Sequence, residues 1–472
     1  MTAPFDLAGP PLHIHLVGIG GAGMSAIAEV LAALGHRVSG SDRAEGPVLR
    51  RLRAAGIDAR SPHDGANVDG ADVVGVSTAI PADNPEIEAA RAAGIPVHHR
   101  FDLLAAIGAT RRTLSVSGTH GKTTTSAMCA FALDRAGLDP SFIIGGEVPG
   151  LGAGARWRTP AAPQASADGW FVLEADESDS TFLAPPRSAA IVTNVEADHL
   201  DHHGTMDALV AAFRTFLAET AGPRVVCADD PGAAALAGEV DGVATYGLSD
   251  DATFHIVDVE PTGSGSAWTV VGPHGSTALR IGVPGLHVVR NATAAFAVAV
   301  LIGADPQGAA RGLADYGGVG RRFEFRGSDR GVTFSDDYAH LPTEVEAVLA
   351  AAAAGRVDGR WSRVVAVFQP HRYSRTEAVW RDYTDSFVDA DVAVVTEIYA
   401  AGEAARDGVS GRLIADAVAA STKAPSVEWA ATREELLSTL DRVLSPGDLC
   451  LTMGAGDLTT LPDAMLARWS SE

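Results

Sequence analysis

The sequence has few cysteines, no long apolar run and no cluster of basic residues, and each absence argues against a class of protein. Its three cysteines, Cys129, Cys227 and Cys450, lie far apart, so the sequence indicates neither a disulfide framework nor a cysteine-based metal site. No apolar run approaches the roughly 18 to 20 residues that span a bilayer, and the first residues lack the pattern of a secretion signal. We therefore expect a cytoplasmic protein without membrane insertion.

The charge of the chain is strongly acidic, with a formal net charge of -23 at pH 7. Nucleic acid would be repelled unless a basic patch overrode this charge, and no run of Lys and Arg supplies one. Small phosphate-bearing ligands remain compatible, because backbone N–H groups and single basic residues bind phosphate within an acidic protein. We therefore expect small-molecule partners and no nucleic acid.

The length of 472 residues is too great for one ordinary hydrophobic core, and the composition, with 46% hydrophobic and 20% charged residues, is typical of a globular α/β protein. Alternating apolar runs and helical patterns predict parallel α/β units. We predict three domains, at residues 1–107, 108–319 and 320–472. The glycine-rich segment 316–322 is the expected hinge before the third domain.

A glycine-rich turn follows the first predicted strand. Gly18, Gly20 and Gly23 match G-x-G-x-x-G before a predicted helix, and Asp42 ends the next predicted strand. This pattern alone favours NAD. Its physical content is broader, because glycines let a diphosphate approach a helix N-terminus and a carboxylate accepts a ribose hydroxyl, so a UDP-sugar also fits. A tight turn without a ligand is the plain alternative.

A second phosphate-binding pattern lies at residues 118–123, GTHGKT, between a predicted strand and a predicted helix. It lacks the first glycine of the full Walker A pattern, because Val116 stands there. Lys122 is expected to neutralise the β- and γ-phosphates of a nucleoside triphosphate, and the Thr123 hydroxyl is expected to ligate Mg²⁺.

Acidic residues and histidines follow the next two predicted strands. Glu174 ends one of them and is the leading second Mg²⁺ ligand, whereas most of the acids at 176, 177 and 179 are expected to be solvated or to cap helices. The segment 194–204, NVEADHLDHHG, has a density of potential ligands that also suits zinc. Spacing alone leaves open which of its histidines binds metal and which packs or caps.

Together, the segments SVSGTHGKTTT, EADESD, NVEADHLDHHG, RRFEF, DDYAHLPTE, FQPHRYSRT and GAGD resemble the Mur ligase family over essentially the whole chain. The resemblance implies a Rossmann-like N-terminal domain that binds a UDP-sugar, a central P-loop-type ATPase domain with a mostly parallel sheet, and a Rossmann-like C-terminal domain that closes over the site. GIGGAGMSAIAEVL at 18–31 and FQPHRYSRT at 368–376 are most similar to the members that add L-alanine to UDP-N-acetylmuramate in peptidoglycan precursor synthesis.

The resemblance also implies roles for individual residues. ATP is expected at Gly118, Thr119, His120, Gly121, Lys122, Thr123, Thr124, His287, Asn291, Arg321, Arg322, Asp336 and Asp337. The UDP-sugar and the amino acid are expected at Gly18, Gly20, Gly21, Ala22, Gly23, Asp42, Ser77, Tyr338, His371, Arg372 and Arg375. Magnesium is expected at Thr123, Glu174 and His199, and catalysis at Lys122, His199, Arg322, His340 and Arg372.

The implied reaction converts the sugar carboxylate to an acyl phosphate, which the amine of alanine then attacks after losing a proton, with His340 as the candidate acceptor. Two segments depart from the family pattern: Val288 replaces an asparagine, and DDYAHLPTE has Ala339 and Leu341 where glycine and histidine are usual. A murein tripeptide recycling ligase, a nicotinamide-dependent oxidoreductase and a non-catalytic nucleotide-binding regulator are the alternatives. A monomer or a homodimer is expected.

Overall fold

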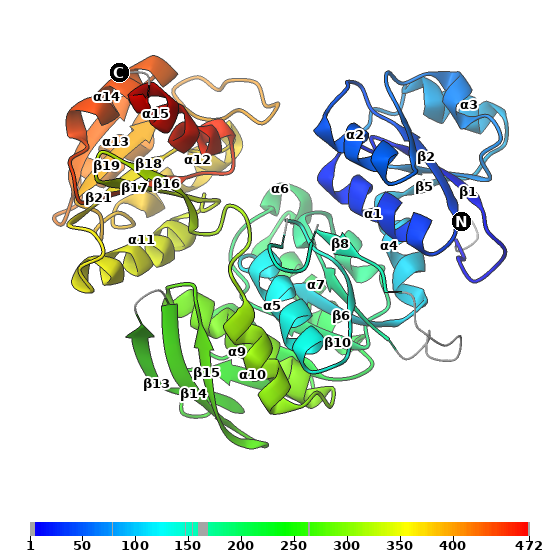
Figure 1. Cartoon of the computed structure of the whole chain (residues 1–472), viewed down its shortest axis with the longest axis horizontal. Helices are drawn as coiled ribbons and strands as arrows, with labels where there is room; N and C mark the ends of the chain where they lie inside the picture. Colours follow the sequence, from blue (N-terminus) through cyan, green and yellow to red (C-terminus); the bar gives the residue numbers. More distant parts are fainter. Residues whose placement is uncertain are drawn as a thin grey trace. The chain divides into compact units, whose positions relative to one another are not determined.

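The computed structural model describes residues 5–77, 79–146, 148–152, 154–158, 169–262 and 265–470, and these residues form three sheets that follow one another along the chain (Figure 1). Contacts divide the chain into two units. One contains the first sheet and most of the second, and the other contains the third sheet within Gly317–Glu472. The three mainly parallel sheets with their helices confirm the predicted three-part α/β class.

The first sheet is parallel, with the strand order β3-β2-β1-β4-β5. Its order reverses between β1 and β4, which is where doubly wound sheets leave a crevice for a ligand. The strands are β1 (His13–Val17), β2 (Arg37–Ser41), β3 (Asp58–Arg60), β4 (Val73–Val76) and β5 (Val97–His99). The helices are α1 (Ala22–Ala33), α2 (Pro47–Ala54), α3 (Pro85–Ala92) and α4 (Arg100–Ala109).

The first and second sheets share a hydrophobic core. Buried side chains of β1, α1 and α4 belong to one cluster with Ile143, Phe171 and Leu173 of the second sheet. The boundary predicted after residue 107 falls within α4, which runs without a break to Ala109 and leads directly into the second sheet.

The second sheet has ten strands in the order β15-β14-β13-β12-β11-β10-β6-β9-β7-β8. The central strands are parallel, and β8 pairs antiparallel with β7 at one end. The strands are β6 (Arg112–Ser117), β7 (Ser141–Ile143), β8 (Ala155–Arg156), β9 (Trp170–Glu174), β10 (Ala189–Val192), β11 (Arg224–Cys227), β12 (Val243–Gly247), β13 (Phe254–Thr262), β14 (Gly265–Gly272) and β15 (Gly275–Ile281). The helices are α5 (Lys122–Arg135), α6 (Leu200–His203), α7 (Met206–Ala218), α8 (Pro231–Glu239), α9 (Leu286–Leu301) and α10 (Pro306–Asp315).

The third sheet has the strand order β16-β17-β21-β18-β19-β20 and is parallel except for the edge strand β16. Hydrophobic clusters cover both of its faces. The strands are β16 (Glu324–Asp329), β17 (Val332–Asp337), β18 (Arg363–Phe368), β19 (Val392–Thr396), β20 (Ser426–Ala430) and β21 (Asp448–Met453). The helices are α11 (Pro342–Val357), α12 (Tyr373–Val379), α13 (Arg412–Ala419), α14 (Arg433–Val443) and α15 (Leu461–Ser470).

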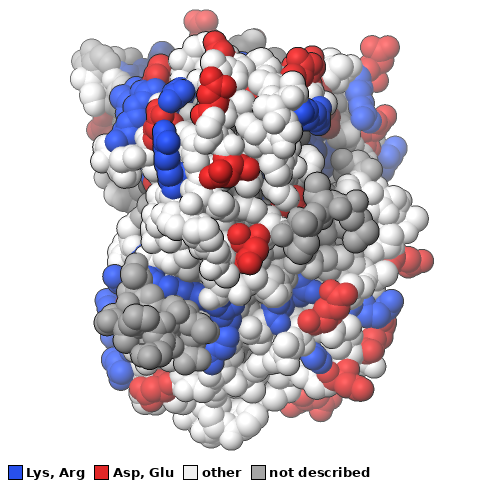
Figure 2. Space-filling model, turned by 90° about the vertical axis from the view of Figure 1, so that its right-hand side faces the viewer, with Lys and Arg blue, Asp and Glu red and all other residues white. Residues whose placement is uncertain are grey.

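The surface and the cysteines agree with a globular α/β protein. In the described part of the chain, no helix is long and apolar enough to cross a membrane. Figure 2 shows a face on which acidic and basic side chains lie beside one another, although the chain as a whole is acidic. The cysteines at 129, 227 and 450 are all buried and unpaired, and burial raises the pKa of each thiol.

A buried carboxylate ties α3 to β2 in the first sheet. Glu86 is fully buried and accepts hydrogen bonds from the Ser41 hydroxyl, from Asn67 Nδ2 at 2.6 Å and from the Asp64 N–H at 3.1 Å, while His15 Nε2 lies 3.6 Å away. Burial alone would raise the pKa of Glu86, but His15 and these hydrogen bonds lower it to about 2. The folded state therefore favours the ionised carboxylate.

We expect Glu86→Gln to lower the free energy of unfolding at pH 7 by about 3 kcal/mol, because the depressed pKa is a stability contribution. That contribution is complete above the ordinary pKa of 4.5 and is lost as the pH falls toward 2. Urea unfolding at several pH values should therefore show the difference between the two proteins shrinking between about pH 5 and pH 2. Glu88→Gln, on the exposed side of α3, is the matched control. A pH-independent difference for Glu86→Gln would contradict the prediction.

Candidate active site

The predicted nucleotide-diphosphate residues gather at the carboxyl ends of neighbouring strands in the first sheet. Gly18 follows β1, Asp42 follows β2 and Ser77 follows β4, with β1 lying between the other two strands. Gly18 has a φ of +80°, and its N–H donates to the Ser41 carbonyl at 2.8 Å. Gly21 is the N-cap of α1, and Ala22 and Gly23 form its first turn, so the positive end of the helix faces this crevice.

Side chains lie close to two of these glycines. A Cβ at Gly20 would lie 2.7 Å from Asp42 Oδ2, which already accepts a hydrogen bond from the Gly20 N–H at 2.9 Å. A Cβ at Gly23 would lie 2.9 Å from the Arg100 guanidinium. Asp42 therefore braces the turn as well as facing the crevice, and Arg100 adds a positive charge beside it.

The loop 118–121 joins β6 to α5 in a backbone conformation that needs glycine at both ends. Gly118 has a φ of +130° and Gly121 a φ of +78°, and a Cβ on Gly118 would overlap Thr193 Oγ1. The loop thus precedes a 14-residue helix, α5, whose N-terminus is suited to phosphate. Thr124 lies buried in the first turn of that helix.

Residues after β10 hold this loop in place. Asn194 Oδ1 accepts a hydrogen bond from the His120 N–H at 2.7 Å, and the Asn194 carbonyl accepts one from the Thr119 N–H at 3.1 Å. The Thr119 hydroxyl accepts from the Glu196 N–H at 2.9 Å, and Glu196 Oε2 lies 3.1 Å from His120 Nε2. Asn194 and Glu196 therefore position the phosphate loop.

Lys122, which is partly buried, forms an ion pair with the buried Glu177. Its Nζ lies 2.8 Å from Glu177 Oε2 and donates to the carbonyls of Gly118 and Thr119 at 2.8 and 3.1 Å. Burial would lower the pKa of Lys122, but the negative charge of Glu177 outweighs it and raises that pKa. Burial raises the pKa of Glu177 as well. The ammonium is thus held charged at the opening of α5.

Two groups of oxygen and nitrogen ligands lie beside the phosphate loop. The Thr123 hydroxyl donates to Glu174 Oε1 at 2.9 Å, which brings together the two predicted Mg²⁺ ligands of the P-loop side. Asp176, Glu177 and His199 form the second group, with one ligand atom from each within 4.8 Å of the others. A divalent cation that prefers oxygen ligands suits this set, which comprises the carboxylates of Asp176 and Glu177, the imidazole of His199 and the neighbouring Thr123 hydroxyl.

The three predicted histidines of 199–203 have different surroundings. His199 adopts a φ of +54° as the N-cap of α6, which aims its ring toward Asp198 and Glu177. His202 Nε2 lies 3.2 Å from the Ser180 hydroxyl, and His203 Nε2 donates to the Glu177 carbonyl at 2.8 Å. Of the three histidines, His199 alone joins the ligand group.

Helix α9 carries the two residues predicted at the adenine. His287 and Asn291 are four residues apart, so they share one side of the helix. The Asn291 amide is buried against the phosphate loop, since a Cβ on Gly121 would lie 3.0 Å from it. The departure Val288 is buried in this helix.

The arginines predicted at the γ-phosphate lie at the start of the third sheet. Arg321 Nη2 donates to the Gly454 carbonyl at 2.6 Å, and the guanidinium carbons of Arg321 and Arg322 lie 4.9 and 5.1 Å from the Tyr338 ring centre. Asp336 accepts hydrogen bonds from Thr452 and Thr459, both at 2.6 Å. The contacts with Gly454 and Tyr338 hold the two arginines within the unit of the third sheet.

Asp336 and Asp337 are buried, which sequence reasoning did not anticipate. Asp337 accepts hydrogen bonds from the Phe323 N–H at 2.8 Å and the Ala339 N–H at 2.7 Å, and burial raises its pKa to about 6. The two carboxylates therefore organise the chain around the arginines and His340. Direct contact of either with ATP stays a prediction.

Three residues predicted for the amino-acid site or for catalysis form a row of rings with Tyr399. Tyr338 and His340 have ring centres 5.3 Å apart, His340 and His371 5.9 Å, and His371 and Tyr399 5.8 Å. His340 Nδ1 donates to the Tyr338 carbonyl at 3.0 Å, so the neutral ring carries its lone pair on Nε2. The rings and their main chain belong to the unit of the third sheet.

His371 accepts a hydrogen bond from Arg375 Nη1 at 3.1 Å through Nδ1. Burial, with the charges of His340, Arg375 and Arg372, lowers the pKa of His371 to about 4. His371 is therefore neutral near pH 7 and orients the Arg375 guanidinium. Arg372 has a φ of +67° at the N-cap of α12, so the turn that carries it is tightly constrained.

The departures Ala339 and Leu341 are both buried, at 1% and 6% exposure. Leu341 is the N-cap residue of α11, and its side chain packs into the interior. The leucine therefore fills the position at which the family usually has a histidine. His340 keeps its place between Tyr338 and His371, beside Glu344 at 3.2 Å.

Some residues of the site were not assigned from the sequence. Arg100 beside Gly23, Glu177 beside Lys122, and Asn194 beside the phosphate loop depend on contacts between segments far apart in sequence. Asp176 and Glu177 follow a strand end by two and three residues, and that position is the one signal in the sequence that pointed to them.

Comparisons with known proteins agree with this geometry. A model of the Mur ligase family catalytic domain matches residues 13–112, one of the Mur ligase middle domain matches residues 116–299, and one of the Mur ligase glutamate ligase domain matches residues 321–456. The matches cover each of the three sheets in turn.

Full-length relatives are similar over nearly the whole chain. UDP-N-acetylmuramate–L-alanine ligases from Kineococcus radiotolerans and Rhizobium meliloti are 47% and 42% identical to it, over 96% and 94% of this chain and 95% and 94% of theirs. The crystal structure of the UDP-N-acetylmuramate-alanine ligase from Thermotoga maritima has a TM-score of 0.78 at 28% identity, covering 98% of this chain and 99% of that one. A murein peptide ligase from Psychrobacter arcticus, at 24% identity and a TM-score of 0.68, shares the fold.

We expect His199→Ala to weaken the binding of Mn²⁺, used as a paramagnetic substitute for Mg²⁺, by at least about tenfold, because it removes one of the ligands grouped with Asp176 and Glu177. Electron paramagnetic resonance titration measures the free ion. His202→Ala is the matched control, since this neighbouring imidazole contacts Ser180 instead. Equal weakening in both variants, or none in His199→Ala, would contradict the assignment.

Proposed function

The chain belongs to the Mur ligase family, and from that premise we propose that it joins L-alanine to the carboxylate of UDP-N-acetylmuramate with the hydrolysis of ATP to ADP and phosphate, in peptidoglycan precursor synthesis. The observation that carries the proposal is the phosphate loop 118–123, which lies beside Glu174, Asp176, Glu177 and His199 in one unit of a chain 47% identical to such a ligase.

The chemistry explains why ATP is needed. A carboxylate does not react with an amine, so its oxygen must first take the γ-phosphoryl group to form an acyl phosphate. The amine then attacks the acyl carbon, the acyl–oxygen bond breaks and phosphate leaves. In the first step, positioning and charge neutralisation supply most of the rate enhancement.

ATP is proposed to lie along the loop that opens α5. Gly118, Thr119, His120, Gly121 and Thr124 surround the phosphates, Lys122 neutralises them, and Asn291 with His287 faces the nucleoside from α9. Lys122 would exchange Glu177 for phosphate oxygens. Arg321 and Arg322 are proposed to meet the γ-phosphate when the ligase is closed.

The ligand groups beside the loop fit Mg²⁺. Thr123 and Glu174 offer a hydroxyl and a carboxylate, and Asp176, Glu177 and His199 offer two carboxylates and an imidazole. The ion, when bound, supplies positive charge that neutralises the phosphates. The chain's own residues hold it in position.

The UDP-sugar is proposed to bind in the crevice of the first sheet. The N–H groups of Gly20, Gly21, Ala22 and Gly23 at the start of α1 suit a diphosphate, and Asp42 and Ser77 line the neighbouring strand ends. Gly18 provides the turn that opens this crevice.

The amine of alanine is proposed to lose its proton to His340. The Nε2 lone pair of His340 makes it an acceptor, and Tyr338 lies against its ring. Arg372 and Arg375 are proposed to bind the alanine carboxylate through two parallel N–H bonds, with neutral His371 holding Arg375.

Each of the three predicted domains is proposed to bind one substrate. Residues 1–107 bind the UDP-sugar, 108–319 bind ATP, and 320–472 bind the amino acid and close over the site. We further propose a cytoplasmic protein that acts as a monomer or a homodimer. A nicotinamide-dependent oxidoreductase leaves Lys122 and its carboxylate neighbours without a role, and a murein tripeptide ligase would need a wider amine site.

We expect Lys122→Ala to lower kcat by at least roughly 10²-fold, because it removes the cation that neutralises the transferred phosphoryl group. The assay measures phosphate release with ATP, Mg²⁺, UDP-N-acetylmuramate and L-alanine. Lys423→Ala, at an exposed turn, is the matched control, and circular dichroism verifies folding. Near-normal turnover in folded Lys122→Ala would refute the proposed ATP site.

The proposed function itself is tested with the unmodified protein and a panel of substrates. Phosphate release should depend on UDP-N-acetylmuramate and be fastest with L-alanine, with glycine and L-serine slower by about 10- to 200-fold at most, since one methyl group is worth about 1 to 3 kcal/mol in a pocket. Turnover with murein tripeptide but not with L-alanine would favour the recycling ligase. A nicotinamide absorbance change without phosphate release would favour the oxidoreductase.

A further inference from the structure

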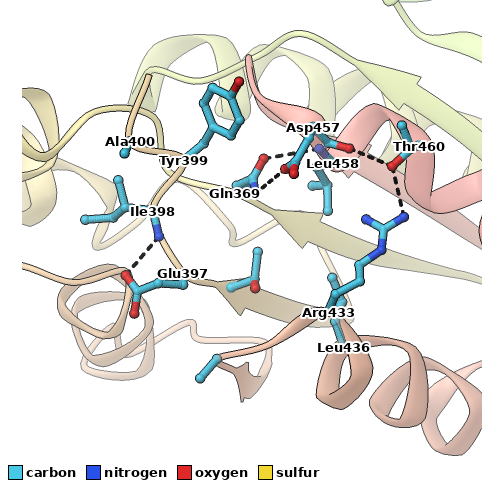
Figure 3. Close-up of a pocket in the computed structure, with 12 residues that line it drawn as sticks. Gln369, Glu397, Ile398, Tyr399, Ala400, Arg433, Leu436, Asp457, Leu458 and Thr460 are labelled. Carbon is cyan, nitrogen blue, oxygen red and sulfur yellow. Dashed lines mark hydrogen bonds between the residues drawn. The ribbon is translucent and has the colours of Figure 1, made fainter. Parts of the chain in front are cut away.

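The third sheet contains a cavity that the proposed reaction does not use. It measures about 350 Å³ and lies at the carboxyl ends of β18, β19 and β20, beside the loop that follows β21 (Figure 3). Its lining includes Gln369, Ile398, Tyr399, Arg433, Asp457 and Thr460. Such a cavity at the carboxyl ends of parallel strands is where this class of sheet binds ligands.

The cavity offers hydrogen-bonding groups, one cation and the carboxylates of Glu397 and Asp457. Gln369 Nε2 donates to Asp457 Oδ1 at 2.9 Å, and Arg433 Nη2 donates to the Thr460 hydroxyl at 3.0 Å (Figure 3). Burial lowers the pKa of Arg433. The negative charge of Asp457 also acts on Arg433, so the cavity favours a neutral amide over a carboxylate.

Tyr399 stands between this cavity and His371. Its side chain lines the cavity, and its ring is stacked on the His371 ring with centres 5.8 Å apart and planes 9° apart. The loop after β21 presses on the ring as well, since a Cβ on Gly456 would lie 2.5 Å from Tyr399 Cγ. His371 itself is not among the residues that line the cavity.

Main-chain bonds hold this wall independently of the ring. The Arg372 N–H donates to the Tyr399 carbonyl at 2.9 Å, and the Tyr399 N–H donates to the Pro370 carbonyl at 2.8 Å. These bonds keep the segment that carries His371 and Arg372 in place when the side chain at 399 is changed. Truncation of the ring would thus join the two spaces without releasing that segment.

We propose that Tyr399 determines specificity by closing the amino-acid site against the cavity, so that only a short side chain fits. The inference rests on the proposed function, which places the amino acid beside His371, Arg372 and Arg375. When the ring is removed, the joined space accepts L-amino acids whose longer side chain ends in an amide. Gln369 and Arg433 supply the complementary groups.

The test compares kcat/KM for L-alanine, L-glutamine and L-glutamate in wild type, Tyr399→Ala and Tyr399→Phe, by phosphate release from the full chain with ATP and UDP-N-acetylmuramate. Tyr399→Ala should raise the ratio of L-glutamine to L-alanine at least about tenfold, the scale of a steric pocket effect. Tyr399→Phe, which keeps the ring, should leave the ratio unchanged. L-glutamate should gain less than L-glutamine in Tyr399→Ala, because its carboxylate would lie beside those of Glu397 and Asp457.

The outcomes separate this proposal from the proposed function. No ligation of L-alanine by wild type would refute the proposed function, whereas an unchanged ratio in a Tyr399→Ala variant that still uses L-alanine would overturn the role of Tyr399 alone. If Tyr399→Ala turns over no amino acid, Tyr399→Leu decides by the same ratio. A higher ratio of L-glutamine to L-alanine in Tyr399→Leu supports the proposed role of Tyr399, and an unchanged ratio overturns it.

Discussion

The ion pair between Lys122 and Glu177 is the interaction on which the rest of the site depends. A partly buried ammonium is stable when a carboxylate or a phosphate lies beside it, and Glu177 fills that place at 2.8 Å. Glu177 also belongs to the ligand group with Asp176 and His199. On the proposed function, a phosphate that takes Lys122 leaves the Glu177 charge to be balanced by a cation, so nucleotide and metal binding are coupled through one side chain.

The same architectural rule places each set of functional groups. The glycine turn follows β1, the phosphate loop follows β6, and the row of rings and the cavity of the third sheet follow β17, β18 and β19. Because neighbouring parallel strands end at one edge, segments far apart in sequence meet there. Asn194 and Glu196 hold the phosphate loop for this reason, as β10 is hydrogen-bonded to β6.

Local patterns in the sequence predicted the parts that depend on local physics. The parallel α/β units were predicted, and the glycine turns expected at 18–23 and 118–121 do lie between a strand and a helix. Strands β13 to β15 were missed, although the alternating burial of β15 reflects a half-exposed strand. Arg100, Glu177 and Tyr399 take their roles from contacts across the fold, which spacing does not encode. The burial of Asp336 and Asp337 and their hydrogen bonds also depend on such contacts, and their approach to ATP stays a prediction.

The burial of all three thiols has a practical consequence. Cys129, Cys227 and Cys450 are shielded, and their raised pKa values keep them protonated, so alkylating dyes react with them slowly. Cysteines introduced singly on the surface of each unit would therefore be labelled selectively, with no need to replace the native ones. Fluorescence energy transfer between such labels can test the proposed closure over the site.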